Sequence, residues 1–326
     1  MPSSIRGSGC NEPLQVTSTP TPAMEGLAAQ PISLWTDTRR NILRQRVAQA
    51  GLLLLGLLIA IAIAAPIIAT HEPNDPVGID EGLVTARKLG PCIHLLGCPS
   101  DQPEHYFGID RNGRDVYRRV VYGARVSLLV GIATVGFAIV LGTLLGSVAG
   151  YAGGWLDNLI MRLMDVVLAF PSLILAIALV TVLGPGLLNA ALSIGIVAIP
   201  IYARVMRASV LSIKERDYVV ASRALGESSR GILLRRILPN ALTPLIVVGT
   251  LGIAGAILDV AALSFLGLGA QPPLAEWGSM IGLDRNQLFS APHLIMAPGI
   301  ALSLSVLGFN LLGDGLRDAL DPRLNR

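Results

Sequence analysis

The stretch at residues 216–240, RDYVVASRALGESSRGILLRRILPN, decides how the chain is organised, because it is the longest polar segment with membrane-grade apolar sequence on both sides. It predicts two short helices joined near Gly226, since glycine tolerates the tight turn between two helices. Apolar side chains line one face of the segment and basic side chains line the other. The apolar residues are Tyr218, Val219, Leu225, Ile232, Leu233, Ile237 and Leu238, and the basic ones are Arg223, Arg230, Arg235 and Arg236. A segment with two such faces is expected to lie against a surface.

The composition is that of a polytopic membrane protein, because 52% of the 326 residues are hydrophobic and only 14% are charged. A net charge of +3 is too small to predict a nucleic-acid partner. Three cysteines make no zinc or disulfide-rich framework, and the four histidines stand in or beside predicted loops. The sequence therefore predicts no catalytic residue and no metal site. Neither lysine, Lys88 or Lys214, has the neighbours of a phosphate-binding loop, so ATP-driven transport would need another chain to hydrolyse the ATP.

The apolar runs predict six membrane-spanning helices, each near the length that crosses a hydrocarbon core of about 30 Å. They cover about residues 47–70, 127–150, 160–183, 187–202, 242–263 and 293–312. Arginines at 39–46 before the first run place the N-terminus in the cytoplasm. Residues 60–62 also resemble a signal-peptidase site, and Arg39-Arg40 is a bare twin-arginine, but the apolar core is longer than a signal peptide's.

Charge supports a topology with both termini in the cytoplasm. Residues 204–236 carry eight Lys/Arg against three acids, as a cytoplasmic loop does. The basic residues of the long polar segment at 71–124 argue against its extracytoplasmic placement. The excess of basic residues at 204–236 is stronger evidence, and it supports this topology. Residues 1–38, rich in Pro, Ser, Thr and Gly, predict a disordered tail.

Three features inside the spans predict the packing, the shape and the polarity of particular helices. Glycines in the second span, Gly131, Gly136, Gly142 and Gly146, would let neighbouring helices approach closely. Pro171 would kink the third span. Asp259 would sit near the outer mouth of the fifth span, either as a snorkelling interfacial residue or as part of a polar pathway.

The extracytoplasmic segment offers two further predictions. Cys92 and Cys98 would share an oxidising compartment, which favours a local disulfide over two unrelated thiols. Asp115 stands three and four residues before Arg118 and Arg119, so a surface helix held by ion pairs explains these charges better than direct contact with a transported molecule.

Several motifs resemble those of binding-protein-dependent ABC transporter permeases. Ala221, Gly226 and residues 238–240 are similar to the family's cytoplasmic loop motif, although Val220 stands in place of its Glu and Ser222 in place of its second Ala. Residues 107–128, 153–171, 263–280 and 309–323 resemble the dipeptide, oligopeptide and nickel branch of the family. The stretch at 263–280 is where that branch meets its binding protein; for Trp277 within it, the alternative is an interfacial anchor.

This resemblance implies an all-α, polytopic fold with six membrane-spanning helices and a type I ABC transporter (MetI-like) permease core. The domains are then a tail at 1–38, a first membrane helix at 39–70, an extracytoplasmic loop at 71–124, a transmembrane domain at 125–314 with a coupling loop at 208–240, and a cytoplasmic tail at 315–326. Implied residues for coupling to the ATPase are Asp217, Tyr218, Ala221, Ser222, Ala224, Leu225, Gly226, Leu238, Pro239 and Asn240. Asp259 and Pro171 are the candidates for the translocation pathway.

The implied function is that of a permease subunit of an ATP-driven peptide importer in the inner or plasma membrane. Its implied partners are a second, homologous permease, two ATP-binding subunits, an extracytoplasmic solute-binding protein and membrane lipid. The chain itself would bind no cofactor, because ATP and magnesium would lie on the ATPase subunits. Import of nickel or another small solute is the alternative. An ion-coupled secondary transporter fits less well, because it would need charged residues near the bilayer midplane, and a membrane hydrolase would need a histidine beside Ser264 or Ser303.

Overall fold

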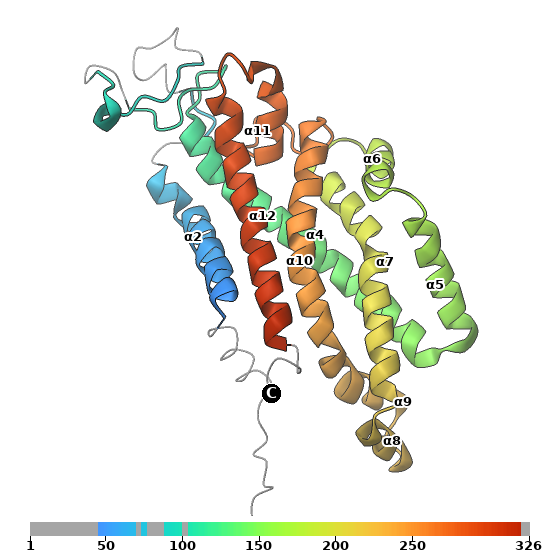
Figure 1. Cartoon of the computed structure of the whole chain (residues 1–326). Coiled ribbons are helices and arrows are strands. Elements are labelled where there is room, and N and C mark those ends of the chain that lie inside the picture. The colour runs from blue at the N-terminus through green and yellow to red at the C-terminus, as the bar shows by residue number, and fades with distance from the viewer. Residues whose placement is uncertain (1–44, 70–72, 77–87, 100–103, 321–326) are drawn as a thin grey trace, which may run out of the picture.

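A computed structural model of the chain describes residues 45–69, 73–76, 88–99 and 104–320, and this part is organised as helices (Figure 1). The elements in order are α2 (Arg46–Ile68), η1 (His94–Leu96), α4 (Val116–Ala152), α5 (Gly154–Leu168), α6 (Ser172–Leu183), α7 (Leu187–Lys214), α8 (Asp217–Ala224), α9 (Ser229–Gly231), a π-helical turn η2 (Ile232–Ile237), α10 (Leu238–Phe265), α11 (Trp277–Asp284), η3 (Arg285–Gln287) and α12 (His293–Leu320).

Among the residues that the structure describes, five helices are long and apolar enough to cross a membrane: α2, α4, α7, the continuous helix Ser229–Phe265 and α12. The pair α5 and α6 makes a sixth if it counts as one span, because its two halves pass the same test together. Their axes differ by 91°. The prediction of six spans is therefore met only if α5 and α6 count as one span, and this third span is broken rather than merely kinked.

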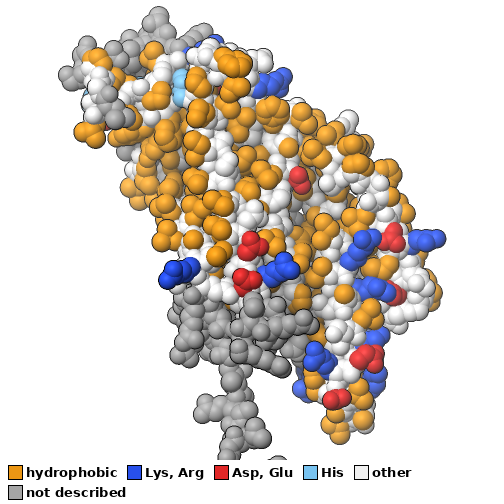
Figure 2. All heavy atoms as spheres, in the orientation of Figure 1, with side chains coloured by type: hydrophobic (Ala, Val, Ile, Leu, Met, Phe, Trp, Pro, Cys, Tyr) orange, Lys and Arg blue, Asp and Glu red, His pale blue; other side chains and the backbone are white. Residues whose placement is uncertain are grey.

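The spans form a bundle that α4 crosses diagonally, with α12 between α2 and α10 and with α5 and α6 at one edge (Figure 1). We call one end of the bundle the α8 end and the other the α11 end, after the short helices that stand there. Hydrophobic side chains cover most of the visible face, and charged ones gather toward the α8 end and over α5 and α7 (Figure 2). This is the surface of a helix bundle that is embedded in lipid.

Small residues set the closest approach between spans, as predicted for three of the four glycines. A Cβ at Gly142 would lie 2.6 Å from Cβ of Tyr202, and one at Gly146 would lie 2.3 Å from the carbonyl oxygen of Ala203, so α4 and α7 touch backbone to backbone. Gly131 makes room for the side chain of Ile257 of α10, whose Cγ1 would lie 2.3 Å from an added Cβ. The prediction was wrong for Gly136, where an added Cβ would have nothing within 4 Å, because this glycine lies on the exposed side of α4.

Several predicted boundaries fall inside helices, because the helices continue beyond the apolar runs. The boundary at 124/125 lies within α4, which begins at Val116 where Asp115 caps it by accepting a bond from the amide of Tyr117. The coupling loop at 208–240 begins inside α7, and the boundary at 314/315 lies inside α12. The predicted tail at 1–38 and the boundary at 70/71 lie outside the described residues.

Candidate functional site

The chain between α7 and α10 forms a helical hairpin at the α8 end of the bundle (Figure 1). One apolar anchor holds α8 in place: Val219 is fully buried in the same cluster as Ile232 and Ile237. This anchor joins α8 to the base of α10 and, through Val210 in the same cluster, to the last turns of α7. A displacement of α8 would therefore act on two membrane spans at once.

Gly226 ends α8 with a Schellman motif, which fixes the angle of the hairpin. Its φ is +81°, a left-handed conformation that favours glycine. The amide of Gly226 donates to the carbonyl oxygen of Arg223, and the amide of Glu227 donates to that of Ser222, both at 3.1 Å. These two bonds satisfy carbonyls that the helix end would otherwise leave unpaired.

The second arm of the hairpin is one continuous helix from Ser229 to Phe265, so the prediction of two short helices around Gly226 was right for α8 and wrong for the second arm. Ser228 caps its start by accepting a bond from the amide of Gly231 at 3.2 Å. The turn before the proline is π-helical, with the amide of Leu238 donating to the carbonyl of Leu233. Such a wider turn removes the clash between a proline ring and the carbonyl four residues earlier, so the helix passes through Pro239 without a break.

The hairpin presents apolar side chains to the outside at its tip. Leu225 is 88% exposed, and Tyr218 and Val220 are about half exposed. The predicted single apolar face is therefore wrong, because Val219, Ile232 and Ile237 point into the bundle while Leu225 and Tyr218 do not.

Polar contacts between the arms flank this tip. The amide of Asn240 donates to the hydroxyl of Tyr218 at 3.4 Å, and Arg236 pairs with Glu227 at 3.2 Å. The remaining predicted coupling residues Asp217, Ala221, Ala224 and Pro239 are exposed, and Ser222 and Leu238 are half-buried.

The break between α5 and α6 lies on the surface of this chain. Residues 169–171 join the two helices, and Pro171 stands at the N-cap of α6. Phe170 is 55% exposed, and Pro171, Ser172 and Leu173 are exposed as well. A helix leaves its first amides without partners inside the helix, and Pro171 offers no side-chain cap.

Asp259 lies in α10, six residues before its end. Its neighbours Val260 and Leu263 belong to the same buried cluster as Ala176 and Val180 of α6. The carboxylate is partly exposed, at the border of the outward stripe that includes Gly255 and Leu258. Both pathway candidates thus belong to the same side of the bundle.

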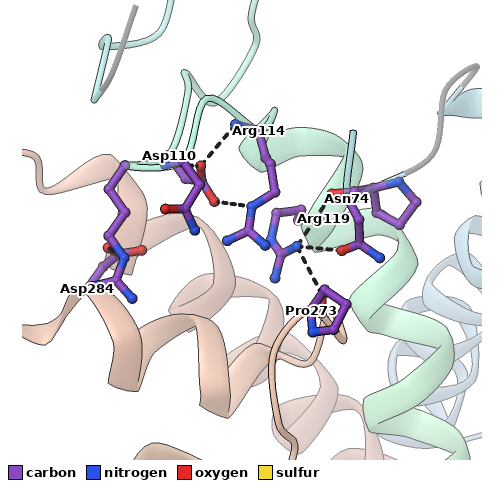
Figure 3. A network of polar contacts seen from close by, with 9 residues as sticks. Asn74, Asp110, Arg114, Arg119, Pro273 and Asp284 are labelled. Carbon is purple, nitrogen blue, oxygen red and sulfur yellow. Dashed lines mark hydrogen bonds and ion pairs between the residues drawn. The ribbon is translucent and has the colours of Figure 1, made fainter. Parts of the chain in front are cut away.

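A buried polar network fastens the α11 end (Figure 3). The side chain of Arg119, only 2% exposed, donates to the oxygens of Asn74 at 2.9 Å and Pro273 at 3.3 Å. Asp110 accepts a bond from the guanidinium of Arg114 at 2.7 Å. The predicted partner was wrong for Arg119, whose side chain joins other segments instead of Asp115.

The prediction holds for the other arginine of this pair. Arg118 lies 3.7 Å from Asp115, at the predicted i,i+3 spacing, but Asp115 and Arg119 are buried rather than on a surface. That these charges do not contact the transported molecule stays a prediction.

Glu276 and Trp277 are internal residues that seat α11 against α4. The carboxylate of Glu276 caps α11 by accepting bonds from the amides of Gly278 and Ser279, and burial raises its pKa. The indole of Trp277 is fully buried and donates to the carbonyl of Val120 at 3.0 Å. Trp277 is therefore neither an interfacial anchor nor a surface contact.

The loop before α4 carries the two cysteines of the predicted pair. The structure joins Cys92 and Cys98 as a disulfide, with Cα atoms 5.4 Å apart. The bond closes a short loop at the α11 end, and its formation in the cell stays a prediction.

Sequence reasoning missed two ion pairs between α5 and α7. Asp157 receives two bonds from the guanidinium of Arg207, at 2.5 and 2.6 Å, and Asp165 receives one from Arg204 at 2.6 Å. The available signal was that charged residues in or beside membrane spans need partners, since Asp165 stood inside the predicted third span and Asp157, Arg204 and Arg207 stood just outside the third and fourth.

The geometry of the α8 end suits the transmission of movement to the membrane spans rather than the catalysis of a chemical reaction. Within the residues that the structure describes, no group of three His, Cys, Asp or Glu side chains could hold a metal ion. What the α8 end offers instead is a rigid hairpin with an apolar tip, joined directly to two membrane spans.

Comparisons with known proteins match the chain to membrane components of transport systems. Residues 142–326 match the family model described as "Binding-protein-dependent transport system inner membrane component", and residues 33–91 match "N-terminal TM domain of oligopeptide transport permease C". The chain is 45% identical to a dipeptide transport system permease protein from Alkalihalophilus pseudofirmus, over 90% of this chain and 91% of the relative. It is 45% identical to a di/tripeptide transport system permease protein from Pseudomonas aeruginosa, over 85% and 88%. It is 41% identical to a glutathione transport system permease protein from Pectobacterium atrosepticum, over 89% and 91%.

Proposed function

Because the chain belongs to the family of binding-protein-dependent transport system inner membrane components, the multi-pass and non-catalytic permease subunits of ABC transporters, we propose that it is one permease of an importer for short peptides. A transporter of this class works with an ATPase and a binding protein. In our proposal two ATP-binding subunits dock on the α8 hairpin, and a second, homologous permease completes the pathway. The α8 end and both termini then face the cytoplasm.

The observation that carries this proposal is the exposed apolar tip of the hairpin. Leu225 projects from a turn that Gly226 and the Schellman bonds hold rigid, and Tyr218 and Val220 flank it. Exposed apolar side chains on a rigid element outside the bundle are typical of a protein interface. The excess of basic residues at 204–236 supports a cytoplasmic position for this element.

The proposed function is tested by reconstitution. The chain and its companion permease are purified with the ATPase subunits, placed in liposomes and supplied with the binding protein. We expect uptake of labelled di- or tripeptides that requires ATP and is blocked by vanadate. Proton-coupled uptake by the chain alone would contradict the proposal and support the secondary-transporter alternative.

The same preparation distinguishes the substrates. Import of glutathione fits a peptide importer and would narrow the substrate class, since glutathione is itself a short peptide. Nickel uptake without peptide uptake would replace the peptide proposal with the nickel alternative and leave the family assignment intact.

Replacing Leu225 by glutamate is expected to weaken binding of the ATPase subunits by about thirtyfold, because an apolar contact at the centre of an interface contributes about 2 kcal/mol. The measurement is the amount of ATPase that co-purifies with the permease. Since Leu225 is exposed in this chain, the substitution leaves the bundle intact. Leu225→Met, which keeps the apolar contact, is the control, and equal ATPase recovery with the Glu and Met variants would refute docking at this tip.

We propose that the translocation pathway runs beside the broken span. Non-helical backbone at membrane depth is tolerated only where it is covered by protein or faces water, because lipid offers no hydrogen bonds. The break at 169–171 is exposed in this chain, so in our proposal Pro171 and Asp259 face a water-filled path beside the second permease.

This proposal predicts that Ser172→Cys reacts with a membrane-impermeant thiol reagent in the assembled transporter whose native cysteines are replaced by serine. The rate should change when ATP is added, because access alternates between the two sides. Leu57→Cys, exposed at the middle of α2, is the control expected to face lipid and stay unreactive. Reaction at Leu57→Cys but not at Ser172→Cys would overturn the assignment.

A further inference from the structure

We propose that the two ion pairs between α5 and α7 form a latch, Asp157–Arg207 with Asp165–Arg204, through which α7 carries the movement of the α8 hairpin to the broken span. These are positioning residues, and the inference rests on the proposed function, because it needs an ATPase that moves α8. The claim beyond that function is that these four side chains make α5 follow α7, whereas α6 already packs against α7 through the buried side chains of Ala176 and Val180.

The first step is that α7 and α8 move together. Helix α7 runs unbroken to Lys214, and only Glu215 and Arg216 separate it from α8. The amide of Arg216 donates to the carbonyl of Ile213 in α7 at 3.0 Å, and the amide of Val219 in α8 donates to the carbonyl of Arg216 at 2.9 Å. A displacement of α8 therefore reaches the end of α7 through about two residues of hydrogen-bonded chain.

The second step is that α5 has little apolar packing of its own. Leu159, Leu163 and Val166 are about half exposed along its length, and Asp157 is the one buried residue of the helix. By contrast, α4 meets α7 through its glycines at backbone distance. The pair α4 and α7 is thus tightly joined, and α5 lies beside it with Met164 partly buried against their shared cluster and Leu159, Leu163 and Val166 turned outward.

The third step is that charged contacts hold α5 to α7 at two heights. Near its start, Asp157 accepts both arms of the Arg207 guanidinium, at 2.5 and 2.6 Å. Two turns further along, Asp165 accepts from Arg204 at 2.6 Å. A bidentate pair fixes both position and orientation, and a second contact along the same helix also resists its rotation.

The two ion pairs differ in how far their side chains are exposed to solvent, so one of them would break more easily than the other. The side chains of Arg204 and Asp165 are 50% and 56% exposed, whereas Asp157 is 12% exposed. Asp165 stands four residues before the break at Ala169, so the more exposed pair lies beside the joint of α5 and α6. The inner pair holds the helix, and the outer pair can exchange its partner for water when the joint moves.

Charge reversal tests the latch in the reconstituted transporter. The variants are D157R, R207D and the double variant that carries both, compared with the wild type. Each single variant should lower the number of peptides imported per ATP hydrolysed by about tenfold, and the double variant should recover most of it, because the pair is restored with its charges exchanged. Basal ATP hydrolysis and co-purification of the ATPase should stay near wild type in all of them.

A second set of variants covers the case that reversed charges prevent insertion. D157N and R207Q remove the bonds without placing like charges together, and a cysteine pair across α5 and α7 reports by cross-linking whether the helices stay together. Unchanged import per ATP in the neutral and reversed variants would overturn the proposal. So would a double variant that is inserted and binds the ATPase but fails to recover.

The outcomes separate the latch from the proposed function. If the wild-type chain neither binds ATPase subunits nor imports peptide, the proposed function fails. If the wild type imports peptide and the single variants do so with equal efficiency, only the latch fails.

Discussion

Replacing Gly226 by proline is expected to abolish transport while the chain still inserts into the membrane. The native φ of +81° is closed to proline, whose ring fixes φ near −65°. The substitution also removes the amide that donates to the carbonyl of Arg223. A misplaced proline costs about 3 kcal/mol, which is about a hundredfold in the population of the correctly angled hairpin.

The measurement for this variant combines three readouts from one membrane preparation: the amount of inserted permease, the ATP hydrolysis stimulated by the binding protein, and peptide uptake. We expect the first to stay near wild type and the other two to be lost, because the hairpin lies outside the bundle. Gly226→Asn is the matched control, since asparagine tolerates the left-handed region and keeps its amide. If uptake persists in the proline variant, the angle of the hairpin does not matter for coupling.

Replacing Gly146 by valine is expected to disrupt the bundle itself. A Cβ at this position would lie 2.3 Å from the carbonyl oxygen of Ala203 and 2.9 Å from Cβ of Met206, so backbone must shift. Overpacking of this kind costs about 3 kcal/mol, and more where the obstacle is backbone. The separation of α4 from α7 would be seen as a lower melting temperature in detergent and a smaller yield of monodisperse protein.

The control for this variant is provided by the same helix. Gly136 has open space where a Cβ would stand, so Gly136→Val keeps the helix propensity change and adds no clash. We expect its melting temperature to stay within a few degrees of wild type. Equal losses in both variants would show that valine harms α4 through helix propensity, and that the close contact with α7 contributes nothing.

The number and order of the spans could be predicted from the sequence, because a membrane helix is determined locally. Its backbone bonds lie within one segment, and its length is set by the hydrocarbon core. The apolar runs therefore located α2, α7, α10 and α12, and Gly226 located the turn of the hairpin. Helix ends were less predictable: Asp115 and Ser228 set them by capping, outside the apolar runs.

The sequence alone also indicated that residues 216–240 form a surface hairpin, since polarity and a glycine are properties of the segment itself. Only the tertiary structure decided which side chains of that hairpin remain exposed, because Val219 and Leu225 are alike in polarity and differ only in what packs against them. The same holds for Arg207 and Asp157, fifty residues apart in the chain, and for Arg119, which reaches across three segments. Such partners depend on how helices pack against one another, and helix packing is a long-range property that no single stretch of sequence contains.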